Sequence, residues 1–226
     1  MFYIKILLLR IMRVALLVGI SGKAGKALMD GLINSRHYKK VIVFTRRENR
    51  RIKNIHLKKV IVDFDNIENY GSEFKEADDV FCLLGTDYIS TLKLDDAAMF
   101  EYEYPIKVAR AAKENGVKNF FLLNPTKANL MSSKDKMKLR AKLALEIQQL
   151  GFDNFFIFKV NAIGESVNIE SSMFAAIKGI GTIINLVGMG LLDKVRPTPA
   201  NLVAKKMIEV AISNPLEKKE FLPQDY

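Results

Sequence analysis

Short apolar runs alternate with segments of helical periodicity along most of the chain. Runs of strand length lie near residues 14–19, 40–45, 59–63, 79–84, 118–123 and 154–158. Helical spacing predicts helices over 23–34, 95–115, 133–150, 171–187 and 199–213, and Pro105 predicts a kink or break within the second of these. Strands that alternate with helices predict a parallel sheet covered on both faces. The right-handed crossover rule then gives the strand order 3-2-1-4-5-6, so we predict an α/β fold with a doubly wound parallel sheet.

The pattern continues without an internal repeat, a low-complexity linker or a change of composition that would separate two domains. A chain of 226 residues is long enough to bury a substantial core. We therefore expect one domain over residues 1–226, in which 161–226 form a small helical cap on the substrate side. Residues 1–12 precede the first predicted strand and are too short an apolar run to span a bilayer. We interpret them as an extension, with a peripheral membrane contact as the minority alternative.

Three glycines follow the first predicted strand at the point where the first helix pattern begins. In a dinucleotide-binding crossover, glycines allow the sharp turn, the close approach of backbone to a pyrophosphate, and close packing of helix on strand. A tight turn without a ligand is the alternative interpretation. The predicted contacts to a dinucleotide are Gly19, Ile20, Ser21, Gly22, Lys23, Ala24 and Gly25.

A basic pair, Arg46 and Arg47, ends the second predicted strand. Proteins that prefer NAD carry an acidic residue at this point, which holds the ribose 2′-hydroxyl. Two guanidinium groups instead suit a 2′-phosphate, so the pattern predicts NADP(H), with a solvated arginine pair as the alternative.

The net charge of +10 is concentrated in residues 36–59, which hold ten Lys or Arg residues and one acid, Glu48. A basic patch attracts nucleic acid or anionic membranes. The only aromatic residues in this segment are Tyr38 and Phe44, and Phe44 belongs to a strand, so no base-stacking platform is visible. We interpret the segment as a cofactor-phosphate site with a solvated rim, and nucleic-acid binding is the weaker hypothesis.

The single cysteine, Cys82, lies in an apolar strand and has no partner for an internal disulfide. It is expected to be a buried core thiol, and its isolation fits a reducing, cytoplasmic compartment. We expect neither a transmembrane segment nor a metal ion.

These motifs together resemble the atypical short-chain dehydrogenases, and within them the Tat-interacting-protein-like NAD(P)H-binding oxidoreductases, over about residues 14–211. Further matches are Val62-Asp63-Phe64, Phe81-Cys82-Leu83-Leu84-Gly85-Thr86, the strand at 118–123 and Arg196-Pro197-Thr198-Pro199. The resemblance implies a Rossmann domain that binds NADPH, with Asp63 at the adenine amino group. It adds Phe64, Leu84, Gly85, Thr86 and Lys142 as cofactor contacts. From the residues alone, Asp63 fits equally well as a cap of the following turn.

The superfamily's catalytic Tyr-x-x-x-Lys pair is incomplete, because no tyrosine lies between Pro105 and Tyr226. The tyrosine position falls on Lys136 or Lys138, and the lysine position on Arg140 or Lys142. Spacing to the following glutamate favours Lys138 and Lys142 as the site residues. The serine expected after the fifth strand is replaced by Asn124-Pro125-Thr126.

Two functions follow from this incomplete site. The first is a cofactor-binding regulatory protein that has lost Tyr-Lys catalysis and responds to NADP(H) by changing a protein partner. The second is a non-standard NADPH-dependent oxidoreductase that acts on a small carbonyl substrate, with the proton supplied by Lys138 or by water.

Overall fold

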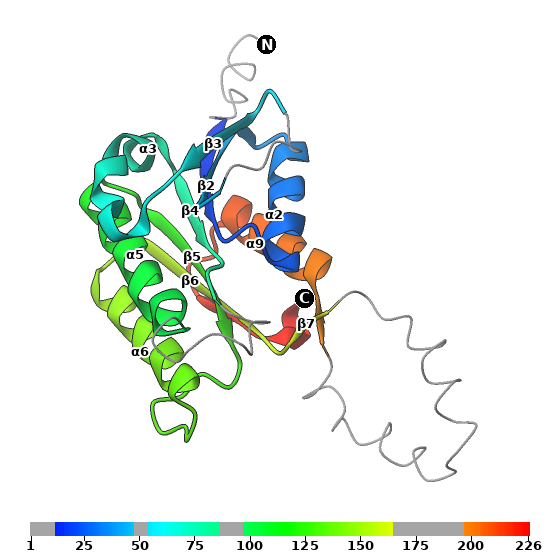
Figure 1. Ribbon diagram of the computed structural model, residues 1–226. Coiled ribbons are helices and arrows are strands. Elements are labelled where there is room, and N and C mark those ends of the chain that lie inside the picture. The colour runs from blue at the N-terminus through cyan, green and yellow to red at the C-terminus, as the bar shows by residue number, and fades with distance from the viewer. Residues whose placement is uncertain (1–11, 48–53, 86–96, 165–196) are drawn as a thin grey trace.

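The computed structural model describes residues 12–47, 54–85, 97–164 and 197–226 (Figure 1). A seven-stranded sheet has the order β3-β2-β1-β4-β5-β6-β9, and every neighbouring pair is parallel. The strands are β1 (Arg13–Val18), β2 (Tyr38–Thr45), β3 (Leu57–Ile61), β4 (Asp79–Cys82), β5 (Asn119–Pro125), β6 (Asn154–Val160) and β9 (Glu220–Phe221). The predicted order of the first six strands is confirmed, and β9 extends the sheet by one edge strand.

Helices cover both faces of the sheet (Figure 1). One layer contains α2 (Lys23–Asn34) and α9 (Ala200–Ser213), and the other contains η1 (Phe64–Tyr70), α3 (Gly71–Glu76), α5 (Tyr104–Glu114) and α6 (Asp135–Gln149). Successive side chains of a strand point to opposite faces, so Leu16 joins the core under α5 while Leu17 joins the core under α2. Burial on both faces explains why the central strands are continuous apolar runs.

The break predicted at Pro105 takes the form of a π-helical segment, η2 (Met99–Glu103), that runs into α5. Proline has no N–H to donate and disfavours a regular helical turn before it. The N–H of Tyr104 donates to the carbonyl of Met99, five residues earlier, which widens the helix at this point. The start of the helix predicted at residue 95 lies outside the described residues.

Much of the cap predicted over residues 161–226 falls on 165–196, outside the described residues, and the described elements after 161 belong to the sheet and its layers. Helix α9 packs along α2 and buries Val203 and Met207 against the sheet, while β9 pairs with β6. These elements complete the Rossmann layers, because the apolar stripe of α9 fits the sheet face that α2 leaves open. A short pair, β7 (Ile163–Gly164) with β8 (Thr198–Pro199), and the turn η3 (Pro223–Asp225) are the other elements here. The helix predicted near 171–187 lies outside the described residues.

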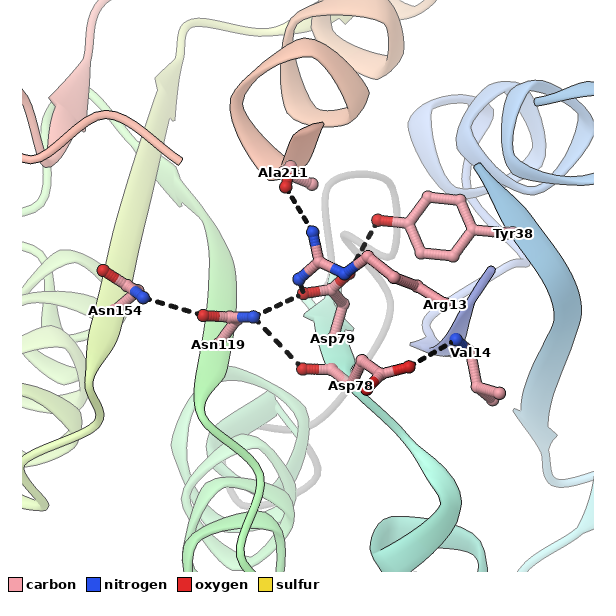
Figure 2. A network of polar contacts seen from close by, with 8 residues as sticks. All are labelled: Arg13, Val14, Tyr38, Asp78, Asp79, Asn119, Asn154 and Ala211. Carbon is pink, nitrogen blue, oxygen red and sulfur yellow. Dashed lines mark hydrogen bonds and ion pairs between the residues drawn. The ribbon is translucent and has the colours of Figure 1, made fainter. Parts of the chain in front are cut away.

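A buried polar network joins the amino ends of the central strands, at the sheet edge opposite to the carboxyl ends (Figure 2). Asp79 at the start of β4 is fully buried and forms an ion pair with Arg13 of β1. The Tyr38 hydroxyl donates to Asp79 Oδ2 at 2.7 Å, and Asn119 Nδ2 donates to Oδ1 at 2.9 Å. Arg13 also donates to the carbonyl of Ala211 at the end of α9. One carboxylate therefore links four strands to a helix.

We expect this network to make stability depend on pH between about 4 and 6. Burial raises the pKa of the Asp79 carboxyl to about 6, against opposing effects of the Arg13 charge and the Tyr38 hydrogen bond. Because the folded pKa exceeds the unfolded value of about 4, the folded state holds the proton more tightly. The contribution of Asp79 to the free energy of unfolding therefore falls as the pH rises through this range.

Urea unfolding of wild type and Asp79→Asn tests this expectation, with the exposed Asp153→Asn as control. The difference in free energy of unfolding between wild type and Asp79→Asn should change between about pH 4 and 6 and be constant above about pH 7. A difference that is constant from pH 4 upward would contradict it.

Candidate functional site

A cleft of about 570 Å³ lies at the carboxyl ends of the central strands. Ligands bind at this edge in open α/β sheets. Its lining includes residues 19–25, 44–47, Phe64, 83–85, 100–101, 123–125, Arg140, 160–161 and Ile163. The structure thus brings together most of the predicted cofactor contacts: Gly19, Ile20, Ser21, Gly22, Lys23, Ala24, Gly25, Arg46, Arg47, Phe64, Leu84 and Gly85. Thr86 lies outside the described residues.

Two of the three glycines in the first turn are required by the packing of the chain itself. Gly19 has φ +99°, and a Cβ there would lie 2.6 Å from the carbonyl of Leu83. A Cβ on Gly25 would lie 2.1 Å from the carbonyl oxygen of Gly19. Both positions hold α2 tightly against the turn, and neither has room for a side chain.

Gly22 differs, because a Cβ there would meet nothing within 4 Å. It precedes the first residue of α2, forms no side-chain cap, and is followed by a first turn without an acidic residue. The first N–H groups of a helix lack intrahelical acceptors and carry a partial positive charge. The open space beside Gly22 therefore suits an anionic group such as a phosphate.

The far end of the cleft is basic and aromatic. Arg46 and Arg47 follow β2 and are exposed, and the Thr45 hydroxyl donates to the carbonyl of Arg47 at 3.0 Å within the turn. The guanidinium carbon of Arg46 lies 4.4 Å from the centre of the Phe100 ring. This end can offer two guanidinium groups to a dianionic ligand.

The opposite, inner end of the cleft contains a buried ion cluster. Arg140 of α6 is 3% exposed; its Nε donates to Asn124 Oδ1 at 3.0 Å and its Nη1 to the carbonyl of Leu84 at 2.8 Å. Glu101 of η2 is 1% exposed and lies 3.7 Å from Arg140 and 3.0 Å from the Lys136 ammonium. Two cations and one carboxylate thus meet at this end.

Solved structures of the same architecture match nearly the whole chain. Pen from Bacillus thuringiensis superposes with a TM-score of 0.67 over 93% of this chain and 68% of that one, at 17% identity. The Bordetella bronchiseptica enzyme WbmH, solved in complex with NAD+, gives a TM-score of 0.63 over 89% and 73% of the two chains, at 14% identity. At these identities the likeness establishes the fold.

No protein-family model matches the chain. Protein HTATIP2 of Rattus norvegicus is 28% identical over 147 residues, which cover 63% of this chain. The match spans 60% of the rat protein, less than two thirds of its length. The chain is thus similar to the atypical short-chain dehydrogenases in sequence as well as in fold. The resemblance read from its motifs is thereby confirmed.

Lys138 and Lys142, the predicted catalytic pair, are not among the residues that line the cleft. Lys138 and Lys142 are each two residues from Arg140, which is a rotation of about 200° around α6. Both therefore lie on the helix face opposite to Arg140. Lys138 pairs with Asp135 at 3.4 Å, and the Lys142 ammonium lies 4.6 Å from the centre of the Tyr102 ring. Of the alternative pair, Arg140 lines the cleft, and Lys136 is connected to it through its ion pair with Glu101, which lines the cleft.

Sequence reasoning missed Glu101 and did not favour Arg140. One signal was present, because Arg140 shares a helical stripe with Leu143 and Ile147, both fully buried. Glu101 gave no signal, since its partners are distant in the sequence and its face depends on the π-helical segment before Pro105.

Asp63 lies beside the cleft and not among its lining residues. Its carboxylate accepts hydrogen bonds from the N–H of Asp65 at 3.0 Å and from Asn66 Nδ2 at 2.8 Å. These bonds lower the pKa of the exposed Asp63 carboxyl, and the bond from Asn66 has the larger effect. The capping role is confirmed, and contact with an adenine amino group stays a prediction.

None of the described tyrosines lines the cleft. The Tyr226 hydroxyl donates to the carbonyl of Lys159 at 2.7 Å, and the Tyr102 hydroxyl donates to Glu146 at 2.6 Å. Tyr3 and Tyr88 lie outside the described residues. Thr126, at the replaced serine position, donates its hydroxyl to Asn161 Oδ1 at 2.8 Å. Its hydroxyl is therefore bonded to the residue that follows β6, which itself lines the cleft, whereas Thr126 does not.

Cys82 is buried in β4, as predicted from its apolar strand. Burial raises the pKa of its thiol to about 11, so it is protonated at neutral pH and a poor nucleophile. The described part of the chain holds no group of three His, Cys or acidic residues arranged for a metal, and none of its helices could cross a membrane.

Proposed function

We propose that the chain binds NADP(H) in this cleft and acts as a cofactor-dependent regulatory protein without Tyr-Lys catalysis. The observation that carries the proposal is the pair Arg46 and Arg47 at one end of a cleft whose middle is the glycine turn. Dinucleotide binding is further supported by WbmH, a protein of the same fold solved with NAD+.

The residues of the cleft fit a dinucleotide. Space for a pyrophosphate is open beside Gly22, where a Cβ would meet nothing, and the first turn of α2 supplies N–H donors. A volume of about 570 Å³ is within the usual range of ligand pockets. Phe64 adds an apolar side chain to the lining of the cleft.

Preference for NADP(H) over NAD(H) follows from charge at the ribose end. Two guanidinium groups attract a 2′-phosphate, and neither accepts a hydrogen bond from a free 2′-hydroxyl as a carboxylate would. Arginine also presents planar donors that match phosphate oxygens in pairs.

Loss of Tyr-Lys catalysis follows from the residues at the inner end of the cleft, which replace the tyrosine and the lysine. Bound NADPH supplies a hydride, and carbonyl reduction needs a proton donor beside it. Lys136 and Arg140 stand at the tyrosine and lysine positions, and both are paired with Glu101. An arginine stays protonated throughout the working pH range, so it cannot serve as the acid. A protein that binds the cofactor without consuming it can report its presence to a partner.

The Lys136–Glu101 pair also supports a second candidate, a non-standard oxidoreductase. Its ammonium lies 3.0 Å from a buried carboxylate at the inner end of the cleft. In that function Lys136 gives the proton to a small carbonyl substrate.

Replacing either arginine tests the proposed cofactor. We expect Arg46→Ala and Arg47→Ala each to weaken NADPH binding by about tenfold, from the loss of a charge-assisted contact worth about 1–3 kcal/mol. NADH binding should stay unchanged, because it lacks the 2′-phosphate. Calorimetric titration measures both, with Arg110→Ala on the exposed face of α5 as the matched control. Equal weakening of NADPH and NADH would contradict the assignment of the arginines.

A further inference from the structure

Phe100 lies on the wall of the cleft between its basic and inner ends. It belongs to the π-helical segment η2, as does its neighbour Glu101, and both residues line the cleft. Glu101 contacts Arg140 at the inner end, whereas the Phe100 ring lies 4.4 Å from the guanidinium carbon of Arg46. One segment thus contacts functional side chains at both ends of the cleft.

The Phe100 ring is itself fixed by neighbouring aromatic rings. Tyr104 packs edge-on against it, with ring centres 5.4 Å apart, and Phe64 lies 5.2 Å from Tyr104. Phe64 is 5% exposed and belongs to the main core. A row of three rings therefore extends from the core to Arg46, an exposed side chain that would otherwise sample many rotamers.

We propose that Phe100 is a specificity-determining residue that positions Arg46 for a 2′-phosphate. This inference rests on the proposed binding of NADP(H). The guanidinium carbon lies 4.4 Å from the ring centre, and a guanidinium group stacked on a ring keeps its N–H donors, which all lie in its own plane, directed away from the ring. The edge of Arg46 therefore stays available to phosphate oxygens while the ring restricts its motion.

Positioning before binding reduces the entropy lost when the phosphate is bound. The benefit reaches only a ligand that engages Arg46. Removal of the ring should therefore lower the affinity for NADPH and leave that for NADH unchanged. A merely structural role for Phe100 would affect both nucleotides alike.

The experiment measures the dissociation constants of NADPH and NADH for wild type, Phe100→Leu, Phe100→Tyr, Arg46→Ala and the double variant Phe100→Leu/Arg46→Ala. We expect Phe100→Leu to weaken NADPH binding about two- to fivefold, the range of an exposed cation–π contact, with unchanged NADH binding. Phe100→Tyr keeps an aromatic ring and should therefore keep the wild-type ratio of the NADPH and NADH dissociation constants. In the Arg46→Ala background, Phe100→Leu should have no further effect on NADPH.

An unchanged NADPH-to-NADH ratio in Phe100→Leu would overturn this inference, as would a parallel loss of both affinities. Additive effects in the double variant would overturn it too, because they would show that Phe100 acts without Arg46. These outcomes leave the proposed function intact. A wild-type protein that binds neither nucleotide would instead overturn the proposed function, and this inference with it.

Discussion

Gly25→Ala is expected to destabilise the protein by about 4 kcal/mol or more, at the far end of the range for single substitutions. The new Cβ would lie 2.1 Å from the carbonyl oxygen of Gly19 and 2.9 Å from Cα of Ile20. These are backbone atoms of the turn that joins β1 to α2, so they cannot move aside as a flexible side chain would. Urea and thermal unfolding measure the loss, and a change below about 1 kcal/mol would contradict the packing described.

Gly22→Ala is the matched variant in the same turn, and it should separate binding from folding. Its Cβ meets nothing within 4 Å, so the free energy of unfolding should change by less than about 1 kcal/mol. The methyl group would occupy the space where a pyrophosphate approaches the backbone. We therefore expect NADPH binding to weaken at least about tenfold in a fully folded protein. Wild-type affinity in Gly22→Ala would mean that no phosphate lies there.

The second large effect concerns turnover. The wild type is expected to oxidise NADPH slowly or not at all across a broad panel of aldehydes and ketones, while still binding it. A general acid contributes about 10²–10⁴-fold to such reactions, and no described tyrosine lines the cleft to supply one. NADPH absorbance measures turnover, and calorimetry in parallel confirms that the cofactor is bound.

Three variants of α6 identify the position that matters. Lys136→Tyr is expected to raise turnover, because residue 136 contacts Glu101 at the inner end of the cleft. Lys138→Tyr is the matched control on the opposite helix face and should have no effect. Fast turnover by the wild type that is lost in Lys136→Met would contradict the regulatory proposal and establish the oxidoreductase with a lysine acid.

The sheet was predictable because its strands are buried on both faces. Strands such as β1 and β2 then appear as uninterrupted apolar runs, and the crossover rule fixes their order. β9 was not predicted, since the pair Glu220–Phe221 is too short to form a pattern. The layer to which α9 belongs was also missed, because an apolar stripe shows that a helix is buried without showing what covers it.

The site was predictable where one segment of sequence carries it. Glycines at the start of a helix and arginines at the end of a strand have fixed places in a doubly wound sheet. The inner end of the cleft was not predictable from the sequence. Arg140 is one of five basic residues between 134 and 142, and only its packing distinguishes it from the others. Its burial depends on Glu101, Asn124 and the carbonyl of Leu84, which come from three other elements.

The most direct test of the account is a calorimetric titration of the wild-type protein with NADPH and, separately, with NADH under the same conditions. Binding of NADPH at least about ten times tighter than NADH is the expected result, because Arg46 and Arg47 engage only the 2′-phosphate. Equal affinities, tighter binding of NADH, or no binding of either nucleotide would contradict it.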